Sequence, residues 1–481
     1  MNMKINYKVV LFSTSIFLAG LGACKKEFLE VNPSTAISAK DAFSSPATIA
    51  AGLTGIYDLS TLGAYKYDMI LNNDIKGGDI LVVSGAGNYG RFINGYQFIE
   101  SPTSNEPINY WTTAYRIIAN ANQFELNIPT SPLTEAEKIA YLAETRALRA
   151  EAYFWMVQWF GKPFTLDPEA MGVPLITAPV GPNDAPSPRA KVKEIYAQIL
   201  ADLLYAEVNI PASKTSVYRM TKGAIQGYLA RVYLTMGNYP EASKYAKLAR
   251  TGKPLSSAAA LTAGFRAPTS EWIYALNSRT DDNAGFITVH SFYDPFDVGY
   301  SSFRATDDFL NLFSNADLRR RQFLVNGAIS RRGPEGFLIN KFDFTTSPAQ
   351  DQVIIRSSEM FLIEAEAEAR QGIANEVPAK TALLAIQSRA GVATLPSANT
   401  GQALINEILL ERRKELYGEG FRYFDLLRTK TPLVRTPLAQ SGHWAVFTLQ
   451  PGDNKLVLPL PQVELNANPV LKLQQNPGYG N

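Results

Sequence analysis

Hydrophobic positions recur with helical spacing over much of this chain. Trp111, Tyr115, Ile118, Ala119 and Asn122 follow one another at intervals of one, three or four residues. These intervals place all five side chains on one face of an α-helix. The pattern therefore predicts a helix with one buried face, in which Trp111 packs in the core.

A second long helix begins at a capping-box sequence. Thr134 and Glu137 have the spacing at which each side chain can bond the backbone N–H of the other residue. We expect this helix to run to Trp159, and its second half is apolar on nearly every side, as in a buried helix. A connection rich in Pro and Gly follows at 161–188, and another helix is predicted at about 191–208.

A pair of shorter helices has the spacing of a tetratricopeptide hairpin. Two apolar stripes, at 225–236 and 242–249, flank a turn at 237–240. The residues in register with the repeat are Leu229, Ala230, Tyr233, Gly237, Tyr239, Ala242 and Ala249. Small alanines let two antiparallel helices approach closely. A further hairpin is predicted from helices at 358–371 and 378–389.

Two segments lack this periodicity. Residues 251–355 and 72–101 are rich in Gly, Ser, Asp and aromatic side chains, with only short apolar pieces. Both are predicted to be loops with a few strands. Loops carried on a rigid scaffold are where ligand contacts concentrate, so these two segments are the first places to look for a binding site.

The N-terminus has the layout of an export signal. Lys4 and Lys8 lie before an apolar run that extends from Val9 to Ala23. This run is too short to cross a bilayer as a permanent helix. The run ends in Leu-Gly-Ala followed by Cys24, which resembles the lipobox of bacterial lipoproteins. We expect Cys24 to be lipidated and to hold the mature chain to a membrane. An ordinary signal peptide with a chance cysteine is the alternative.

Composition excludes several classes of function. The chain has 481 residues, one cysteine and two histidines, His290 and His443. It therefore has no internal disulfide, and we expect neither a metal site nor another cofactor. The formal charge of +2 becomes 2 − 2 = 0 when residues 1–23, with Lys4 and Lys8, are removed. A neutral mature chain argues against nucleic acid as a partner.

Charged residues near the C-terminal end have helical spacing. Glu411 and Glu415 are four residues apart, while Arg422, Asp425 and Arg428 step by three. Such spacings favour ion pairs within and between helices. We interpret this cluster as structural and not as a catalytic or anion-binding site.

Many short segments together resemble the SusD/RagB family of cell-surface nutrient-binding lipoproteins. They occur in the family's order along the chain, from the lipobox to the last residues. The segments include Arg146–Ala150, Phe160–Pro163, Lys222–Ala224, Gly237–Tyr239, Ser388–Gly391, Glu411–Leu416, Glu419–Arg422 and Asn476–Tyr479. The resemblance spans essentially the whole mature chain.

The resemblance implies a mainly α fold of tetratricopeptide-like helical hairpins, the SusD-like α-α superhelix, with an irregular loop-rich region packed on it. The expected organisation is a signal peptide at 1–23, a lipidated tether at 24–38 and a single domain at 39–481. Within this domain the scaffold comprises about 39–250 and 356–430, the loop-rich region about 251–355, and a C-terminal strap 431–481.

The resemblance also implies a non-catalytic function. The protein would be lipid-anchored in the outer membrane and face the cell surface. It would bind a nutrient, above all a glycan or oligosaccharide, and deliver it to a SusC-like TonB-dependent transporter for import. A surface glycoside hydrolase, which needs two nearby carboxylates, and a purely structural subunit of an outer-membrane complex are the alternatives.

Candidate ligand contacts follow from the chemistry of sugars. Sugar rings stack on aromatic side chains, and their hydroxyls need amide, carboxylate or guanidinium partners. The aromatic-rich loops supply such residues, whereas Trp155 and Trp159 lie on apolar helical faces and are predicted to be core. The candidates are Asn73, Asp74, Tyr89, Arg91, Tyr96, Trp272, His290, Tyr293, Phe296 and Tyr300.

Overall fold

The structure is a computed structural model of the chain. It describes residues 38–83, 88–181, 183–296, 298–325, 337–339, 341–342, 344, 349–437 and 443–480. The predicted signal peptide, Cys24 and residues 24–37 of the tether lie outside the described residues. Lipidation at Cys24 therefore stays a prediction.

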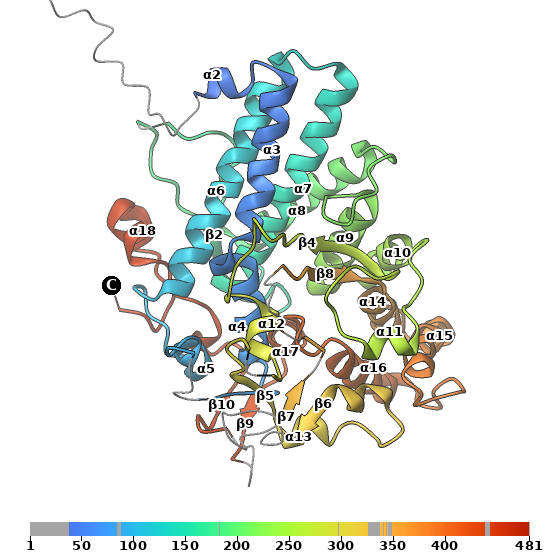
Figure 1. The fold of residues 1–481 in the computed structure, drawn as a ribbon. Coiled ribbons are helices and arrows are strands. Elements are labelled where there is room, and N and C mark those ends of the chain that lie inside the picture. The colour runs from blue at the N-terminus through green and yellow to red at the C-terminus, as the bar shows by residue number, and fades with distance from the viewer. Residues whose placement is uncertain are drawn as a thin grey trace, which may run out of the picture.

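Long helices form one half of the scaffold (Figure 1). They pack side by side in the order α3 (Pro46–Thr61), α6 (Asn105–Asn127), α7 (Glu135–Phe160) and α8 (Val192–Asn209). The capping box predicted at the start of α7 is present, because Thr134 accepts from the Glu137 N–H and the Glu137 carboxylate accepts from the Thr134 N–H. Trp111, Trp155 and Trp159 are buried, as predicted.

Helical hairpins form the other half. The chain forms α9 (Lys222–Met236), α10 (Tyr239–Ala249), α14 (Ser357–Arg370), α15 (Glu376–Arg389) and α16 (Gly401–Glu415). Neighbouring helices of this series pack against each other, and Tyr233 stacks on Tyr245 between α9 and α10, with ring centroids 5.7 Å apart. Gly237 turns the first hairpin with φ of 78°, a conformation that glycine adopts without strain. The predicted hairpins are confirmed.

Short helices and turns connect and cover these two arrays. They are α2 (Ala39–Ala42), η3 (Gly63–Tyr67), α4 (Asp68–Lys76), α5 (Ile93–Gln97), η4 (Ile128–Thr130), α11 (Ala258–Thr262), α12 (Val289–Tyr293), α13 (Asp307–Leu310), η5 (Leu318–Gln322), η6 (Ile373–Asn375), α17 (Arg422–Arg428), η7 (Asn454–Leu456), α18 (Gln462–Ala467) and α19 (Pro469–Lys472). The C-terminal strap thus contains short helices as well as extended chain.

Strands are few and short among the described residues. One sheet has the order β1 (Ile80–Val82), β5 (Phe303–Ala305), β7 (Phe337–Ile339) and β6 (Phe323–Val325). Three antiparallel pairs complete the set: β2 (Met171–Pro174) with β3 (Arg189–Lys191), β4 (Trp272–Leu276) with β8 (Gln352–Arg356), and β9 (Leu433–Arg435) with β10 (Phe447–Leu449). The fold is mainly α with an irregular region on a helical scaffold, as predicted.

Residues 72–101 differ from the prediction. They were expected to be loops with a few strands; β1 agrees with this, but the segment also contains most of α4 and all of α5. Every residue of α4 from Met69 to Lys76 is buried, because the helix packs against η3, α5, β1 and α17. Its polar residues find partners inside the protein, so their polarity does not place them at the surface.

Buried ion pairs join the loop-rich region to the C-terminal helices. The Arg356 guanidinium lies 2.8 Å from Glu415 and 2.7 Å from Glu419 on one side, and 3.1 Å from Glu271 on the other. Asp425 likewise pairs with Arg428 at 2.8 Å. The structural interpretation of the C-terminal charged cluster is confirmed.

Candidate functional site

A hollow of about 760 Å³ opens between η3, the start of α6 and the turn at 88–92. Uncharged polar side chains dominate its wall: Asn94, Ser101, Thr103, Ser104, Asn105 and Asn109. Amides and hydroxyls can each donate and accept hydrogen bonds, so this wall can bond to neighbouring hydroxyl groups of a ligand. The chemistry of the hollow suits a polyhydroxylated molecule.

A tight turn holds Tyr89 at the rim of this hollow. Asn88 is buried and fixes the turn, since its amide donates to the Arg91 carbonyl at 3.2 Å and its carbonyl oxygen accepts from the Gly90 N–H at 3.0 Å. Tyr89 has φ of 55°, a left-handed conformation that is uncommon for residues other than glycine. Such strain persists where the surroundings impose it, often at ligand sites. Here the outcome is a tyrosine side chain that is 85% exposed.

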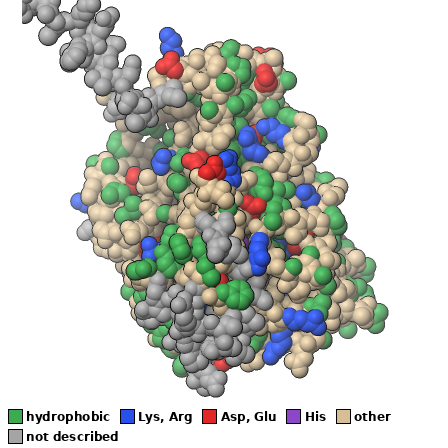
Figure 2. All heavy atoms as spheres, in the orientation of Figure 1, with side chains coloured by type: hydrophobic (Ala, Val, Ile, Leu, Met, Phe, Trp, Pro, Cys, Tyr) green, Lys and Arg blue, Asp and Glu red, His purple; other side chains and the backbone are tan. Residues whose placement is uncertain are grey.

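Aromatic rings gather beside the turn. Tyr89 and Tyr300 meet edge to face with centroids 6.3 Å apart, and the Arg91 guanidinium lies 5.2 Å from the Tyr300 ring. Phe286, which is half exposed, extends the cluster at 5.8 Å from Tyr300. Figure 2 shows hydrophobic side chains gathered beside the undescribed atoms on the lower half of one face. The structure thus brings together Tyr89, Arg91 and Tyr300 of the sequence-predicted set.

Two carboxyl groups also line the hollow. Asp68, the first residue of α4, accepts hydrogen bonds from the Asn72 amide at 2.6 Å and from the Tyr110 hydroxyl. Burial raises the pKa of Asp68 to about 7, and burial also raises the pKa of Glu106. At neutral pH a sizeable fraction of Asp68 is therefore protonated and can donate a hydrogen bond.

Sequence reasoning missed the polar residues that the first turns of α4 and α6 contribute. Asp68, Asn105, Glu106 and Asn109 line the hollow, yet they belong to helices and not to the aromatic-rich loops. A usable signal was present for α6, because Asn105 and Asn109 lie one turn apart on a single face of the predicted helix.

Four of the sequence-predicted residues are buried and hold the fold together. Asn73 accepts from the Tyr423 N–H at 3.0 Å, and Asp74 accepts from the Gly420 N–H at 2.9 Å and from the Tyr293 hydroxyl at 3.0 Å. Tyr96 contacts His443 at 2.5 Å. Burial raises the pKa of Asp74 to about 8. None of Asn73, Asp74, Tyr96 and Tyr293 is more than 3% exposed, and none of them lines the hollow beside Tyr89.

The remaining predicted residues are also not part of the hollow. Trp272 lies in β4 and His290 in α12, and both are fully buried. Phe296 is 53% exposed but does not line the hollow. Most aromatic residues in 272–300 pack the loop-rich region on the scaffold. Of the five predicted residues in this range, Tyr300 is the one that reaches the Tyr89 cluster.

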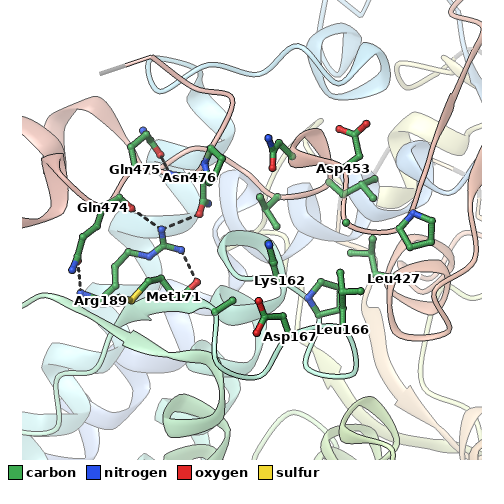
Figure 3. A pocket seen from close by; sticks show the side chains of 18 of the residues that line it. Lys162, Leu166, Asp167, Met171, Arg189, Leu427, Asp453, Gln474, Gln475 and Asn476 are labelled. Atoms are coloured by element: carbon green, nitrogen blue, oxygen red, sulfur yellow. Dashed lines mark hydrogen bonds between the residues drawn. The ribbon is translucent and has the colours of Figure 1, made fainter.

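A second hollow, of about 390 Å³, lies under the C-terminal strap (Figure 3). Its wall is largely aliphatic and includes no aromatic residue among those described. Arg189 at its edge is saturated by protein oxygens, donating to the Gln474 carbonyl at 2.7 Å, the Asn476 side chain at 2.9 Å and the Met171 carbonyl at 2.8 Å. This hollow offers a sugar neither a stacking surface nor a free guanidinium.

A third hollow, of about 640 Å³, lies along the second half of α6. Its other walls are the proline-rich chain from Pro174 to Ser187 and the α18–α19 segment. Within the described part of the chain, no three His, Cys, Asp or Glu side chains converge as metal ligands, and no helix is both long and apolar enough to cross a bilayer.

Comparisons with known proteins find two family models that match this chain. A family model described as SusD family matches residues 325–479, and one described as starch-binding associating with outer membrane matches residues 27–234. SusD-like protein P2 of Formosa agariphila is 25% identical, with 98% of this chain and 99% of that protein aligned.

Solved structures share the fold. A SusD superfamily protein of Bacteroides vulgatus has a TM-score of 0.81 and 26% identity, over 91% of this chain and all of that one. A structure titled laminarin binding SusD-like protein has a TM-score of 0.73 and 24% identity, over the same shares of the two chains. At this last identity the likeness concerns the fold alone.

Proposed function

Because the chain belongs to the SusD/RagB family, we propose that it binds a neutral glycan in the hollow beside Tyr89. One observation carries this proposal: an exposed tyrosine ring, held by a strained turn, stands at the rim of a hollow lined by amides and hydroxyls. The ring offers a flat apolar surface to the C–H face of a sugar, and the wall offers partners to its hydroxyls.

The charges of the site support a neutral ligand. Arg91 is balanced by Asp68 and Glu106 on the wall of the same hollow. Figure 2 shows basic and acidic side chains scattered over one face of the molecule, with neither sign forming an extended patch among the coloured atoms. A polyanion would need an excess of basic groups, which this surface does not present.

The names of similar proteins point the same way. One matching family model is described as starch-binding, and a protein of the same fold is titled laminarin binding. Starch and laminarin are both neutral glucans. We therefore place neutral glucans first among the ligands to be tested.

Binding is tested by affinity electrophoresis and isothermal titration calorimetry with starch, laminarin, xylan and the anionic alginate. We expect retardation by at least one neutral polysaccharide and none by alginate at physiological salt. Binding of alginate alone would contradict a neutral-glycan site. Absence of binding to every polysaccharide would contradict glycan binding as a whole.

We further propose that the protein is anchored in the outer membrane through lipid on Cys24. The lipobox-like sequence before Cys24 and the outer-membrane description of the matching family model support this. The Cys24→Ser variant is expected to move from the membrane fraction to the soluble fraction of lysed cells, while binding glycan as the wild type does. Retention of the variant in the membrane would contradict the lipid anchor.

Delivery to a SusC-like TonB-dependent transporter is the last part of the proposal, and the family membership supports it. Mild detergent extraction of native outer membranes, followed by affinity capture of this protein, is expected to recover a transporter of that class. Recovery of the protein alone, with uptake of the bound glycan unchanged in a deletion strain, would contradict delivery.

One observation favours a hydrolase as the second candidate. Asp68 and Glu106 both line the hollow and both have raised pKa values, and a pair of carboxyl groups is what glycoside hydrolysis requires. Asp68, however, already accepts hydrogen bonds from Asn72 and Tyr110. We expect no new reducing ends when the protein is incubated with a glycan that it binds, and their appearance would favour the hydrolase.

A further inference from the structure

The polar face of α6 joins the Tyr89 hollow to the third hollow. Side chains of this face line the first hollow near the start of the helix and the third hollow further along. In chain order they are Asn105, Asn109, Thr112, Arg116, Asn120 and Gln123. Their spacings of three and four residues keep them in a single row along the helix.

This row is accessible along its length. Asn105, Thr112, Arg116 and Asn120 are exposed, and Asn109 is partly exposed. With a rise of about 1.5 Å per residue, the helix carries the row over about 27 Å between Asn105 and Gln123. A single sugar ring covers only a small part of that distance.

The third hollow has walls that are fixed before any ligand arrives. Asn122 donates to the carbonyls of Ile176 and Ala178 at 3.0 and 3.3 Å, and Arg149 holds the Asn122 oxygen at 2.7 Å. The Tyr115 hydroxyl donates to the Pro174 carbonyl at 2.7 Å. The proline-rich wall is thus bonded to α6, and a ligand meets a hollow that is already formed.

The third hollow also resembles the first in its chemistry. Arg116, Asn120 and Gln123 supply donors and acceptors, and the rings of Tyr115 and Pro179 supply apolar surface. The charged side chains that line it carry both signs, since Arg116 is basic and Asp184 and Glu464 are acidic. Both hollows therefore suit a ligand that is neutral and rich in hydroxyls.

We propose that the ligand is a long, linear, neutral glycan that occupies both hollows and lies along the polar face of α6 between them. This inference rests on the proposed function and extends it, because it assigns a polymer and not a mono- or disaccharide as the preferred ligand. A polymer repeats the same hydroxyl groups along its length, as the row on α6 repeats amide and hydroxyl partners. Once one end is held, the other end meets the third hollow at a high effective concentration.

The test compares ligands of increasing length. Isothermal titration with maltooligosaccharides and laminarioligosaccharides, each from the disaccharide to the decasaccharide, gives Kd as a function of length. For the series that binds, we expect affinity to rise at least about tenfold between the shortest ligand that binds and the decasaccharide, a gain of about 1.4 kcal/mol. Equal Kd values at all lengths would overturn the inference and leave glycan binding in place.

A long glycan can also bind a short site more tightly because it offers that site more positions at which to bind. A variant in the third hollow separates this statistical effect from a gain in affinity that comes from occupying both hollows. Arg116→Ala/Asn120→Ala removes two exposed side chains, whose only side-chain bond to the protein among those described is the one from Asn120 to the Arg116 carbonyl. The double variant is expected to lose most of the gain in affinity between the shortest ligand that it binds and the decasaccharide. Retention of the full gain would overturn the inference.

The matched control is Gln402→Ala/Asn406→Ala. These residues are an exposed pair joined side chain to side chain at 2.8 Å on α16, away from both hollows. This control is expected to keep the full gain with length. If wild-type protein binds neither series at any length, the inference and the glucan preference fail together, a result distinct from binding that ignores length.

Discussion

At the scale of single residues, Tyr89 is the most direct test of the site. The ring is 85% exposed, so Tyr89→Ala removes a stacking surface without opening a cavity in the core. We expect Kd for a bound glycan to rise at least tenfold, equivalent to about 1.4 kcal/mol, with Tm unchanged. Isothermal titration and thermal unfolding measure the two quantities.

Phe296→Ala is the control for Tyr89→Ala. Phe296 is also an exposed aromatic residue in the loop-rich part of the chain, but it does not line the hollow. Glycan binding is expected to be unchanged. Equal losses in both variants would relocate the site, and full uptake of glycan by cells carrying Tyr89→Ala would favour a purely structural subunit.

Asp74 contributes to the way in which stability varies with pH. Burial raises its pKa from 3.8 to about 8, so the folded protein holds a proton that the unfolded chain releases above pH 4. Between these two values the folded state binds more protons, and the free energy of unfolding therefore falls as pH rises. The contribution of Asp74 is fully present below pH 4 and is lost progressively up to about pH 8.

In the Asp74→Asn variant, the free energy of unfolding is expected to decrease less as pH rises than in the wild type. An amide keeps an acceptor for the Gly420 N–H and a polar group for Tyr293, but it does not titrate. Urea unfolding at pH 5 and pH 8 should show a loss of stability that is smaller than in the wild type by at least about 1 kcal/mol, since one pKa unit corresponds to about 1.4 kcal/mol. The same loss in both proteins would contradict the raised pKa.

The types of residue in the sequence predicted the chemistry of the site more accurately than they predicted which individual residues form it. Tyr89, Arg91 and Tyr300 were predicted and do cluster, because polar loops with aromatic residues often lie at the surface. Asn73 and Asp74 are also polar, but they belong to a buried helix, where their oxygens accept hydrogen bonds from Tyr423, Gly420 and Tyr293. One sequence cannot distinguish a polar group that binds a ligand from one that binds the protein's own backbone.

At the scale of elements, two glycines have opposite roles. Gly237 ends α9 in a left-handed conformation, whereas Gly55 lies inside α3 with nothing near the position of an added Cβ. Gly237→Ala is expected to lower the free energy of unfolding by about 1 kcal/mol, and Gly55→Ala to raise it by about 0.5–1 kcal/mol. Urea unfolding measures both, and shifts of the same sign would contradict this assignment.

The helices were predictable because their signals are local. The capping box at Thr134 and Glu137 and the turn at Gly237 each occupy a few consecutive residues, and each marks an element boundary in the structure. The polar row on α6 is equally local, yet its meaning depends on the walls that Tyr89 and Pro174 supply from elsewhere in the chain. Hollows arise from such distant contacts and escape a local pattern.

At the scale of the whole molecule, Arg356 ties separate parts of the chain together. It pairs with Glu271 before β4, with Glu415 at the end of α16 and with Glu419 in the turn that follows, and all four side chains are almost fully buried. Arg356→Met removes the positive charge that offsets these buried carboxylates. We expect it to lower the free energy of unfolding by at least about 3 kcal/mol.

Arg279→Met is the matched control for Arg356→Met. Arg279 pairs with Asp281 at 2.7 Å, but both side chains are about two-thirds exposed. Water solvates these charges after the change, so urea unfolding should show no measurable loss of stability. A comparable loss in the two variants would mean that burial is not what makes the Arg356 cluster important.

The pairing of β4 with β8 has a consequence for how this protein can be altered. The chain leaves the scaffold after Leu276 and returns at Gln352, directly opposite in the antiparallel register. The described residues between these two strands, including Phe286 and Tyr300, belong to an excursion whose two ends are joined by this pairing. Buried side chains of the excursion also bind partners outside it, since Tyr293 donates to Asp74 at 3.0 Å and Arg319 lies 3.0 Å from Glu415, so exchange of the whole excursion would leave these buried partners uncompensated. Because the two ends are joined, the excursion can change in length at its exposed turns, whereas its buried contacts with the scaffold have to be kept.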